Sequence, residues 1–403
     1  MNISFVVTTY NIEPYIRQCL ESLRHCVRDG DQVILVDDGS TDGTERVVAD
    51  FIKEGGFGKD VRWTPVWLGC NTIGGVGIGG NIGMDHAECE TLFFVDGDDY
   101  LIPEGFWKAR RAYEARPTDI SIADYLEYDQ RDRRTKRPAD ASKWDRLSTA
   151  NGLEAIRLAA VDLIAVPWRK FYRTAFLRRH RIRFPEGNFF FEDNPFHWQV
   201  CLKAESVAFS REIVCHHRVN RPGQTMASTG IELTAFFTHY RTIVSGLPRN
   251  RSDLRLQAAR WLLGNMSWQL SRLQPAAFRP YAVRAKNILQ QVGDAEWQAL
   301  SAEMADTTVF HYADRLRAGG VWDVVESWNT NSDRNARRKM EREIQDMAQR
   351  LRGLESQVKT SREILQAQRA IDELRALTEL LPPPRWGGLG TTGALAYNDS
   401  EEG

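Results

Sequence analysis

The stretch Thr91-Leu92-Phe93-Phe94-Val95-Asp96-Gly97-Asp98-Asp99 joins a short apolar run to three carboxylates within four residues. The run has the length of one buried strand, and the carboxylates fall where that strand would end. Like charges this close raise each other's pKa unless a cation or hydrogen-bond donors intervene. A hard divalent cation such as Mg²⁺ or Mn²⁺ takes oxygen ligands and relieves that repulsion. The stretch therefore predicts a metal site, with a polar turn capping the helix after Pro103 as the alternative.

The residues around this stretch alternate strand and helix signals. Six segments carry them: apolar runs at 3–8, 33–36 and 61–68, and helical spacing at 16–26, 44–54 and, after a glycine-rich loop, 81–89. Repeated strand and helix units predict an α/β fold, with a mostly parallel sheet and helices on both faces. In such sheets ligands bind beyond the carboxyl ends of the strands.

Polar clusters follow three of the predicted strands. They are Thr8-Thr9-Tyr10-Asn11, Asp37-Asp38-Gly39-Ser40 and Asp96-Gly97-Asp98-Asp99. Helix capping explains the residues from Ser40 to Thr44 without any ligand. It does not explain Asp37 and Asp38, which suit hydrogen bonding to a base N–H or a ribose hydroxyl. The coincidence of the three clusters predicts one ligand pocket at the carboxyl edge of the sheet.

Composition changes along the chain predict four regions. An α/β domain at 1–226 is followed by a helical subdomain at 227–330, a coiled-coil-like helix at 331–381 and a Pro/Gly-rich, disordered tail at 382–403. The helical subdomain contains large aromatic residues that we expect to anchor its core, namely Phe236, Trp261, Trp268, Trp297 and Trp322.

The coiled-coil-like region has apolar residues at alternating steps of four and three. They are Met340, Ile344, Met347, Leu351, Leu354 and Val358. This spacing is typical of the a/d seam of a coiled coil, and it predicts a homo-oligomer formed through residues 334–381. A lone solvated helix is the alternative, because fewer than four clean heptads are present.

Overall composition excludes several classes of protein. The 53 basic and 54 acidic residues give a net charge of −1, so we expect no nucleic-acid partner. The six cysteines form no C-x-x-C pair, which argues against a structural zinc and predicts reduced thiols in the cytoplasm. No signal peptide precedes the first predicted strand, and no apolar run reaches the ~18 residues of a transmembrane helix. Any membrane contact would be peripheral, at the inner face of the plasma membrane.

Several segments together resemble the family 2 glycosyltransferases of the GT-A fold. Four match in order and spacing: residues 5–11, 37–44, 81–83 and 93–100. Further segments are similar to the acceptor half of bacterial members that build surface polysaccharides: residues 168–172, 183–187, 191–196, and 216–218 followed by 223–226. The resemblance covers about the first 226 residues and implies nothing about the helical remainder.

This resemblance implies an inverting transfer of a sugar from a nucleotide-sugar donor, by default a UDP-sugar, to a hydroxyl of a glycan or lipid-linked acceptor. It implies donor contacts by Thr8, Tyr10, Asn11, Asp37, Asp38, Asn81 and Asp96. Mn²⁺ or Mg²⁺ would be bound by Asp98, with Asp96 and His217 as further contacts; Asp99 would support the turn. The metal would neutralise the diphosphate leaving group.

The likeness also implies that Asp193 is the general base, which takes the proton of the acceptor hydroxyl. Glu192, Trp168 and Lys170 would lie on the acceptor side. A helix N-cap pair is the alternative for Glu192 and Asp193, since Pro195 follows them.

Two points of the resemblance to the family stay open. Relatives often have an arginine before the asparagine matched by Asn81, but Gly79 and Gly80 stand here instead. The diphosphate would then be held by backbone N–H groups or by a basic residue elsewhere. A lone histidine such as His217 is also commonly structural.

Three rival interpretations remain. Residues 75–80 fit G-x-G-x-x-G, but a dinucleotide-binding fold needs that motif after its first strand, where this chain has Thr8-Thr9-Tyr10-Asn11. A nucleotidyltransferase would use a similar sheet and metal, yet the first loop lacks the glycines and lysines that hold a triphosphate. A non-catalytic scaffold would act through the coiled coil alone.

Overall fold

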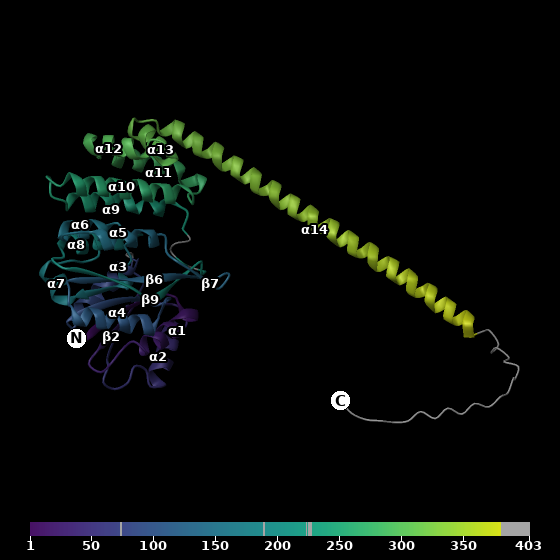
Figure 1. Ribbon diagram of the computed structural model, residues 1–403, viewed down its shortest axis with the longest axis horizontal. Helices are drawn as coiled ribbons and strands as arrows, with labels where there is room; N and C mark the ends of the chain where they lie inside the picture. The colour runs from purple at the N-terminus through teal and green to yellow at the C-terminus, as the bar shows by residue number, and fades with distance from the viewer. Residues whose placement is uncertain (73–74, 188–189, 223, 225–227, 380–403) are drawn as a thin grey trace, which may run out of the picture. The chain divides into compact units, whose positions relative to one another are not determined.

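The computed structural model describes residues 1–72, 75–187, 190–222, 224 and 228–379 (Figure 1). The chain divides into two units, Met1–Asn329 and Thr330–Gly403. The first unit contains both the predicted α/β domain and the predicted helical subdomain. The predicted tail at 382–403 and most of the segment around residue 226 lie outside the described residues, so these boundaries stay predictions.

The first part of the chain follows the predicted alternation of strands and helices. Its elements are β1 (Ile3–Thr9), α1 (Glu13–Arg24), β2 (Gln32–Asp37), α2 (Thr44–Lys53), β3 (Arg62–Trp67), α3 (Gly75–His86) and β4 (Thr91–Asp96). β1 pairs in parallel with both β2 and β4, and β2 pairs in parallel with β3. The parallel arrangement predicted from the sequence is confirmed for these strands.

Later strands extend the same sheet and make it mixed. The following elements are β5 (Tyr100–Leu101), α4 (Pro103–Ala115), β6 (Ile120–Asp129), β7 (Arg134–Lys136), α5 (Trp144–Thr149), α6 (Leu153–Val161), β8 (Lys170–Arg173), α7 (Thr174–Arg179), α8 (Asp193–Lys203) and β9 (Val207–Val219). Within the described residues the order is β3-β2-β1-β4-β8-β6-β9-β5, with β7 paired to β6. β8 runs antiparallel to both β4 and β6, so the run of parallel strands ends at β4.

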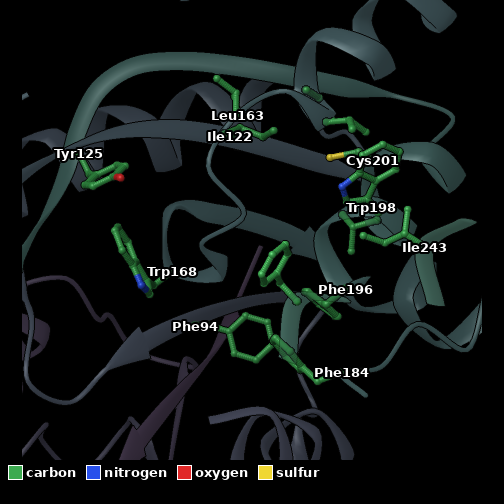
Figure 2. Packing of buried hydrophobic residues seen from close by; sticks show 14 of the residues in the cluster. Phe94, Ile122, Tyr125, Leu163, Trp168, Phe184, Phe196, Trp198, Cys201 and Ile243 are labelled. Carbon is green, nitrogen blue, oxygen red and sulfur yellow. The ribbon is translucent and has the colours of Figure 1, made fainter. Parts of the chain in front are cut away.

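Side chains of β4 pack alternately on the two faces of the sheet, as successive residues of a strand must. Phe93 contacts Phe106 of α4 on one face, with ring centroids 5.2 Å apart. Its neighbour Phe94 contacts Phe184 and Phe196 on the other, at 5.4 and 5.9 Å (Figure 2). Helices cover both faces, which explains why this strand reads as a continuous apolar run rather than an alternating one.

The glycine-rich segment before β4 is a helix and not the loop that the sequence predicted. α3 begins at Gly75, and its glycines face the sheet and a neighbouring segment. A Cβ on Gly83 would lie 2.1 Å from Cγ1 of Val6, and one on Gly80 would lie 2.8 Å from Cε2 of Phe184. These glycines therefore serve close packing of a helix on β1, which removes the dinucleotide-binding interpretation of the motif.

Helices continue beyond the sheet within the first unit. They are α9 (Ala235–Ser245), α10 (Ser252–Leu270), α11 (Pro275–Leu289), α12 (Asp294–Met304) and α13 (Thr308–Arg317). α9 packs on α8, and α10 packs on α9, so the helices stack over the side of the sheet that carries α6 and α8 (Figure 1). The predicted helical region is confirmed, and it belongs to the same unit as the α/β domain.

The expected role of the aromatic residues is confirmed only in part. Phe236 and Trp297 are buried core residues. Trp268 and Trp322 are exposed, at 39% and 67%, so the prediction that they anchor the core is wrong. Each instead lies under an arginine side chain, which covers one face of the ring without burying it.

The second unit consists largely of the long helix α14 (Val321–Glu379), which begins at the end of the first unit. The six predicted seam residues of α14 are each more than half exposed, between 53% and 62%. Helix formation is confirmed, whereas self-association through the seam stays a prediction. No helix in the described part of the chain is long and apolar enough to cross a membrane.

Candidate active site

The three polar clusters predicted from the sequence meet at the carboxyl edge of β1, β2 and β4. Thr9 lies opposite Asp37, and Thr8 lies opposite Asp96, in the parallel register. Backbone hydrogen bonds continue past the strand ends, because Asp38 N and Gly97 N donate to the carbonyl oxygens of residues 9 and 8. The predicted coincidence of the clusters at one edge is therefore confirmed.

The carboxylate of Asp37 anchors the turn after β2. Its Oδ1 accepts a hydrogen bond from Ser40 N at 2.7 Å, and its Oδ2 accepts from Thr9 Oγ1 at 2.8 Å and from Ser40 Oγ at 2.6 Å. Asn11, in the left-handed region with φ 48°, accepts from Thr41 N at 2.8 Å through its side-chain oxygen. The ends of β1 and β2 are thus bound into one block.

Asp38 and Tyr10 stand at the edge of this block. Asp38 accepts from Thr72 N at 2.9 Å and from Asn71 Nδ2 at 3.1 Å. Burial raises the pKa of Asp38, although the hydrogen bonds from Thr72 oppose that shift. Tyr10 is 45% exposed, and Thr8 is half-buried. The structure leaves the Tyr10 ring free to meet a ligand, whereas Asp37 and Asp38 are already bound by their own chain.

The three carboxylates of the turn after β4 differ in their contacts. Asp98 forms an ion pair with Arg221 through Nε and Oδ2, and both side chains are largely buried. Asp99 accepts from Arg218 N at 2.7 Å and lies 2.9 Å from Nδ1 of His217. The Asp96 carboxylate has no hydrogen bond or ion pair with any described residue. Ile102 occupies the N-cap of α4 without a side-chain hydrogen bond, so the alternative of a capping turn is not supported.

Burial and mutual repulsion set the pKa values of this turn. Burial raises the pKa of Asp96 well above its usual range, and the charges of Asp99 and Asp98 raise it further. Burial also raises the pKa of Asp99, against the effect of His217. For His217 itself burial lowers the pKa, but its bond to Asp99 and the charges of Asp98 and Asp96 outweigh that and raise it to about 9. The turn therefore attracts positive charge.

His217 is held in a fixed orientation on β9. Its ring stacks on Trp168, with centroids 4.9 Å apart and an interplanar angle of 23°. Tyr125 contacts the indole of Trp168 edge-on at 4.7 Å (Figure 2 shows both side chains). A histidine that bonds a carboxylate through one nitrogen keeps the other nitrogen available for a ligand. Trp168 is buried and stacks on His217, and its predicted place on the acceptor side stays a prediction.

Glu192 and Asp193 lie where α8 begins. The Glu192 side chain makes no capping hydrogen bond; its Oε1 accepts from Gly77 N of α3 at 3.2 Å. Asp193 is half-buried, and its Oδ1 accepts from Asn194 Nδ2 at 2.9 Å. The preceding Phe191 has a left-handed backbone, with φ 71°, which is strained for an aromatic residue. The N-cap explanation is therefore not supported for Glu192.

The pKa values of these two carboxyl groups are also raised. Burial raises the pKa of Glu192 to about 8, with a contribution from the charge of Asp193. Burial raises the pKa of Asp193 to about 6, although Lys170 lowers it. Lys170 is itself buried, and burial lowers its pKa to about 7. Asp193 also raises the pKa of Asp96, so the two sides of the site interact electrostatically.

Two predicted contacts lie away from the open site. Asn81 is 1% exposed, and its amide bonds to the backbone of Phe184 and to Glu186. In this position Asn81 joins α3 to the segment before α8, and its contact with a donor stays a prediction. The ammonium group of Lys170 donates to the carbonyl oxygen of Val166. Lys170 is buried and acts on Asp193 through its charge, and its place on the acceptor side stays a prediction.

Sequence reasoning missed both arginines that hold the turn after β4. Arg218 donates from Nε to the carbonyl oxygen of Asp98 at 2.8 Å and lies among the rings of Tyr15, Tyr100 and Tyr128. Arg221 pairs with the Asp98 side chain. The only signal was their position just after His217, since their partners lie more than a hundred residues away in the sequence.

Comparison with known proteins gives consistent results. Residues 4–190 match the family described as Glycosyl transferase family 2. The uncharacterized glycosyltransferase EpsJ of Bacillus subtilis (strain 168) is 29% identical over 219 residues, which are 54% of this chain and 61% of EpsJ. The poly(ribitol-phosphate) beta-N-acetylglucosaminyltransferase TarS of Staphylococcus aureus (strain Mu50 / ATCC 700699) is 28% identical over 245 residues, 60% of this chain and 40% of TarS.

Solved structures agree on the fold. The crystal structure of S. aureus TarS 1-349 in complex with UDP-GlcNAc has a TM-score of 0.64 at 22% identity, covering 82% of this chain and 92% of that one. This chain spans about three fifths of the length of EpsJ and a smaller share of full-length TarS. Residues 4–190 therefore form a glycosyl transferase family 2 domain, and the chain shares the GT-A fold of the TarS structure.

Proposed function

We propose that the chain is an inverting glycosyltransferase that moves a sugar from a nucleotide diphosphate donor to a hydroxyl of a glycan or lipid-linked acceptor in surface polysaccharide synthesis. One observation carries the proposal. Burial raises the pKa of the half-buried Asp193 to about 6, and the charge of Asp193 contributes to the raised pKa of Asp96 in the turn after β4. A proton acceptor and a cation-binding turn thus share one site, as transfer from a diphosphate leaving group requires.

The donor would lie along the carboxyl edge of β1, β2 and β4. The exposed ring of Tyr10 is suited to a nucleotide base, and the Asp96 carboxylate has acceptor capacity that the described residues do not use. We take UDP as the nucleotide because TarS 1-349, which shares the fold of this chain, has been crystallised in complex with UDP-GlcNAc.

A divalent metal fits the donor set of the turn after β4. Carboxylate oxygens suit Mg²⁺ or Mn²⁺, and Asp98, Asp96 and His217 would hold it. Among the described residues no three Asp, Glu, His or Cys side chains are already grouped as a metal site. Mg²⁺ commonly binds one or two carboxylates together with substrate phosphates, so we expect metal and donor to bind together. When bound, the metal supplies neutralising charge for the departing diphosphate.

Asp193 would act from the acceptor side. Its raised pKa leaves it ionised at neutral pH yet basic enough to accept the proton of the attacking hydroxyl. The charge of the buried Lys170 lowers the pKa of Asp193 and so favours its ionised form. Location of the chain at the inner face of a membrane is part of the same proposal, because the acceptor of such a transfer is commonly lipid-linked.

The test is calorimetric titration of UDP with and without Mn²⁺, followed by a screen of nucleotide sugars for hydrolysis and transfer. We expect UDP to bind the wild type only with metal. Asp98→Asn should lose at least about tenfold in that affinity, since even outer-shell partners of a metal typically contribute 10- to 100-fold. Absence of UDP binding by the folded wild type under any metal would refute the proposal; binding of nucleoside triphosphates alone would favour a nucleotidyltransferase.

A further inference from the structure

Arg221 is the partner of Asp98, and the role that we infer for it below rests on the proposed function. Arg221 follows β9 and pairs through Nε with the carboxylate that we expect to bind the metal. The two side chains are 13% and 14% exposed. Asp98 therefore already has a cation, and a divalent metal must compete with that cation for the same oxygen.

Arg221 is held by a built turn. Asn220 has a left-handed backbone with φ 60°, donates from Nδ2 to Asp129 at 2.6 Å and donates from its backbone N to Gln224 at 2.9 Å. Gln224 in turn donates to the carbonyl oxygen of Arg218 at 2.9 Å. The guanidinium of Arg221 also lies 5.5 Å from the ring centre of Tyr15. These contacts keep Arg221 beside the carboxylate cluster.

The neighbouring Arg218 is a contrasting case. All of its guanidinium nitrogens bond to neutral oxygens of the chain, namely the carbonyl of Asp98 and the side chains of Gln130 and Gln18. Arg218 is 4% exposed, so it is a structural clamp. Arg221 has one bond to the Asp98 carboxylate and one to the carbonyl oxygen of Pro222. The charge of Arg221 is thus balanced by the Asp98 carboxylate, which we expect to bind the metal instead.

The other candidates for binding the diphosphate are occupied. Gly79 and Gly80 are inside α3, so their N–H groups bond within the helix. The N–H of Gly77, in the first turn of α3, donates to Oε1 of Glu192. A basic group elsewhere must therefore balance the diphosphate charge.

We propose that Arg221 exchanges partners during donor binding: it neutralises Asp98 in the free protein and binds the donor's diphosphate once a divalent metal occupies Asp98. Like charges repel, so the metal displaces the guanidinium from the carboxylate. The displaced group stays within one side-chain length of the metal, where the phosphates lie. A guanidinium fork matches phosphate oxygens through two parallel hydrogen bonds.

Arg221→Gln separates this exchange from simpler roles because two affinities should change in opposite directions. Mn²⁺ alone should bind several-fold more tightly, since the competitor for Asp98 is gone. UDP in saturating Mn²⁺ should bind about 10-fold or more weakly, the usual range for a lost charge-assisted hydrogen bond. Arg221→Lys should keep the competition with Mn²⁺ and recover only part of the UDP affinity, because an ammonium lacks the fork.

Calorimetry on the full chain measures both affinities, and UMP serves as a second nucleotide. The preference for UDP over UMP should shrink in Arg221→Gln if the lost contact is to the diphosphate. Arg62→Gln is the matched control: Arg62 pairs with exposed Glu88 at the opposite edge of the sheet, and its loss should change neither affinity. Thermal unfolding confirms that each variant is folded.

Five outcomes of these titrations are informative. Opposite shifts with a reduced UDP preference support the exchange. A loss of both affinities would mean that Arg221 only supports the structure of the site, which overturns the exchange. A gain in both would mean that Arg221 only competes with ligands for the site, which also overturns the exchange. Unchanged UDP affinity in Arg221→Gln, with normal binding by the wild type, overturns this inference alone. If the wild type binds Mn²⁺ but no UDP, the proposed function itself fails.

Discussion

The two sides of the site contain the same residue types with different partners. On the donor side, Asp98 and Asp99 are each bonded to a cationic side chain, Arg221 and His217. On the acceptor side, Glu192 and Asp193 form no ion pair among the described residues; they accept from an amide N–H and from Asn194. Burial without a paired cation raises the pKa of a carboxyl group. This difference in partners agrees with the two roles that we propose, cation exchange at the turn after β4 and proton acceptance at Asp193.

The strongest test of this contrast compares two adjacent carboxyl-to-amide changes. Asp193→Asn removes the proton acceptor, and we expect kcat to fall about 10²- to 10⁴-fold, the usual contribution of a general base. Glu192→Gln should retain most of the activity, because a pKa of about 8 keeps Glu192 protonated at neutral pH and the amide oxygen still accepts from Gly77 N. Steady-state kinetics and UDP affinity measure both. Equal losses in the two variants would mean that Asp193 has no special role.

The pH dependence of kcat sharpens the same contrast. A base with a pKa of about 6 is protonated below that pH, so kcat should fall about tenfold per pH unit there. Lys170, with a pKa of about 7, and Glu192 face Asp193 and can shift the midpoint. The residual activity of Asp193→Asn should not show this fall of kcat at low pH. If kcat of the variant still falls below about pH 6, the group that titrates is not Asp193.

Helix α3 supports both sides at once, and its glycines test that support. Gly83→Ala would bring a Cβ within 2.1 Å of Val6, and overpacking of this kind costs about 1–3 kcal/mol. Gly264→Ala, in α10, has no atom within 4 Å of the new Cβ, so it should gain up to about 1 kcal/mol from helix propensity. Chemical denaturation measures both free energies of unfolding. Similar values for the two variants would mean that α3 adjusts without cost.

The smallest effect on chemistry is expected from α14. Leu351 and Leu354 are both 59% exposed, and replacing both with Glu should lower the mass measured by light scattering while leaving kcat unchanged. Gln349→Glu with Ser356→Glu adds the same charge away from the seam and should leave the mass unchanged. A wild type that is already monomeric removes the coiled-coil prediction.

Local pattern was enough to predict much of the sheet. β4 was recognisable because its apolar residues are contiguous and end in carboxylates, and β1 and β2 because β-branched runs end in polar turns. Glycine misled the prediction at α3, since glycine usually disfavours a helix interior. Here close packing against Val6 and Phe184 outweighs that propensity, and packing distance cannot be read from local sequence.

For the site residues too, local sequence predicted some properties and only tertiary structure decided the others. The sequence by itself determined that carboxylates follow β2 and β4 and that parallel strands bring them to one edge, because strand direction and residue order are local properties. Only the tertiary structure decided their partners: Arg221 for Asp98, 123 residues away, and Gly77 for Glu192, 115 residues away. Such contacts depend on how distant segments pack. Charge and burial, and hence the chemistry of each carboxylate, therefore appear only in the folded chain.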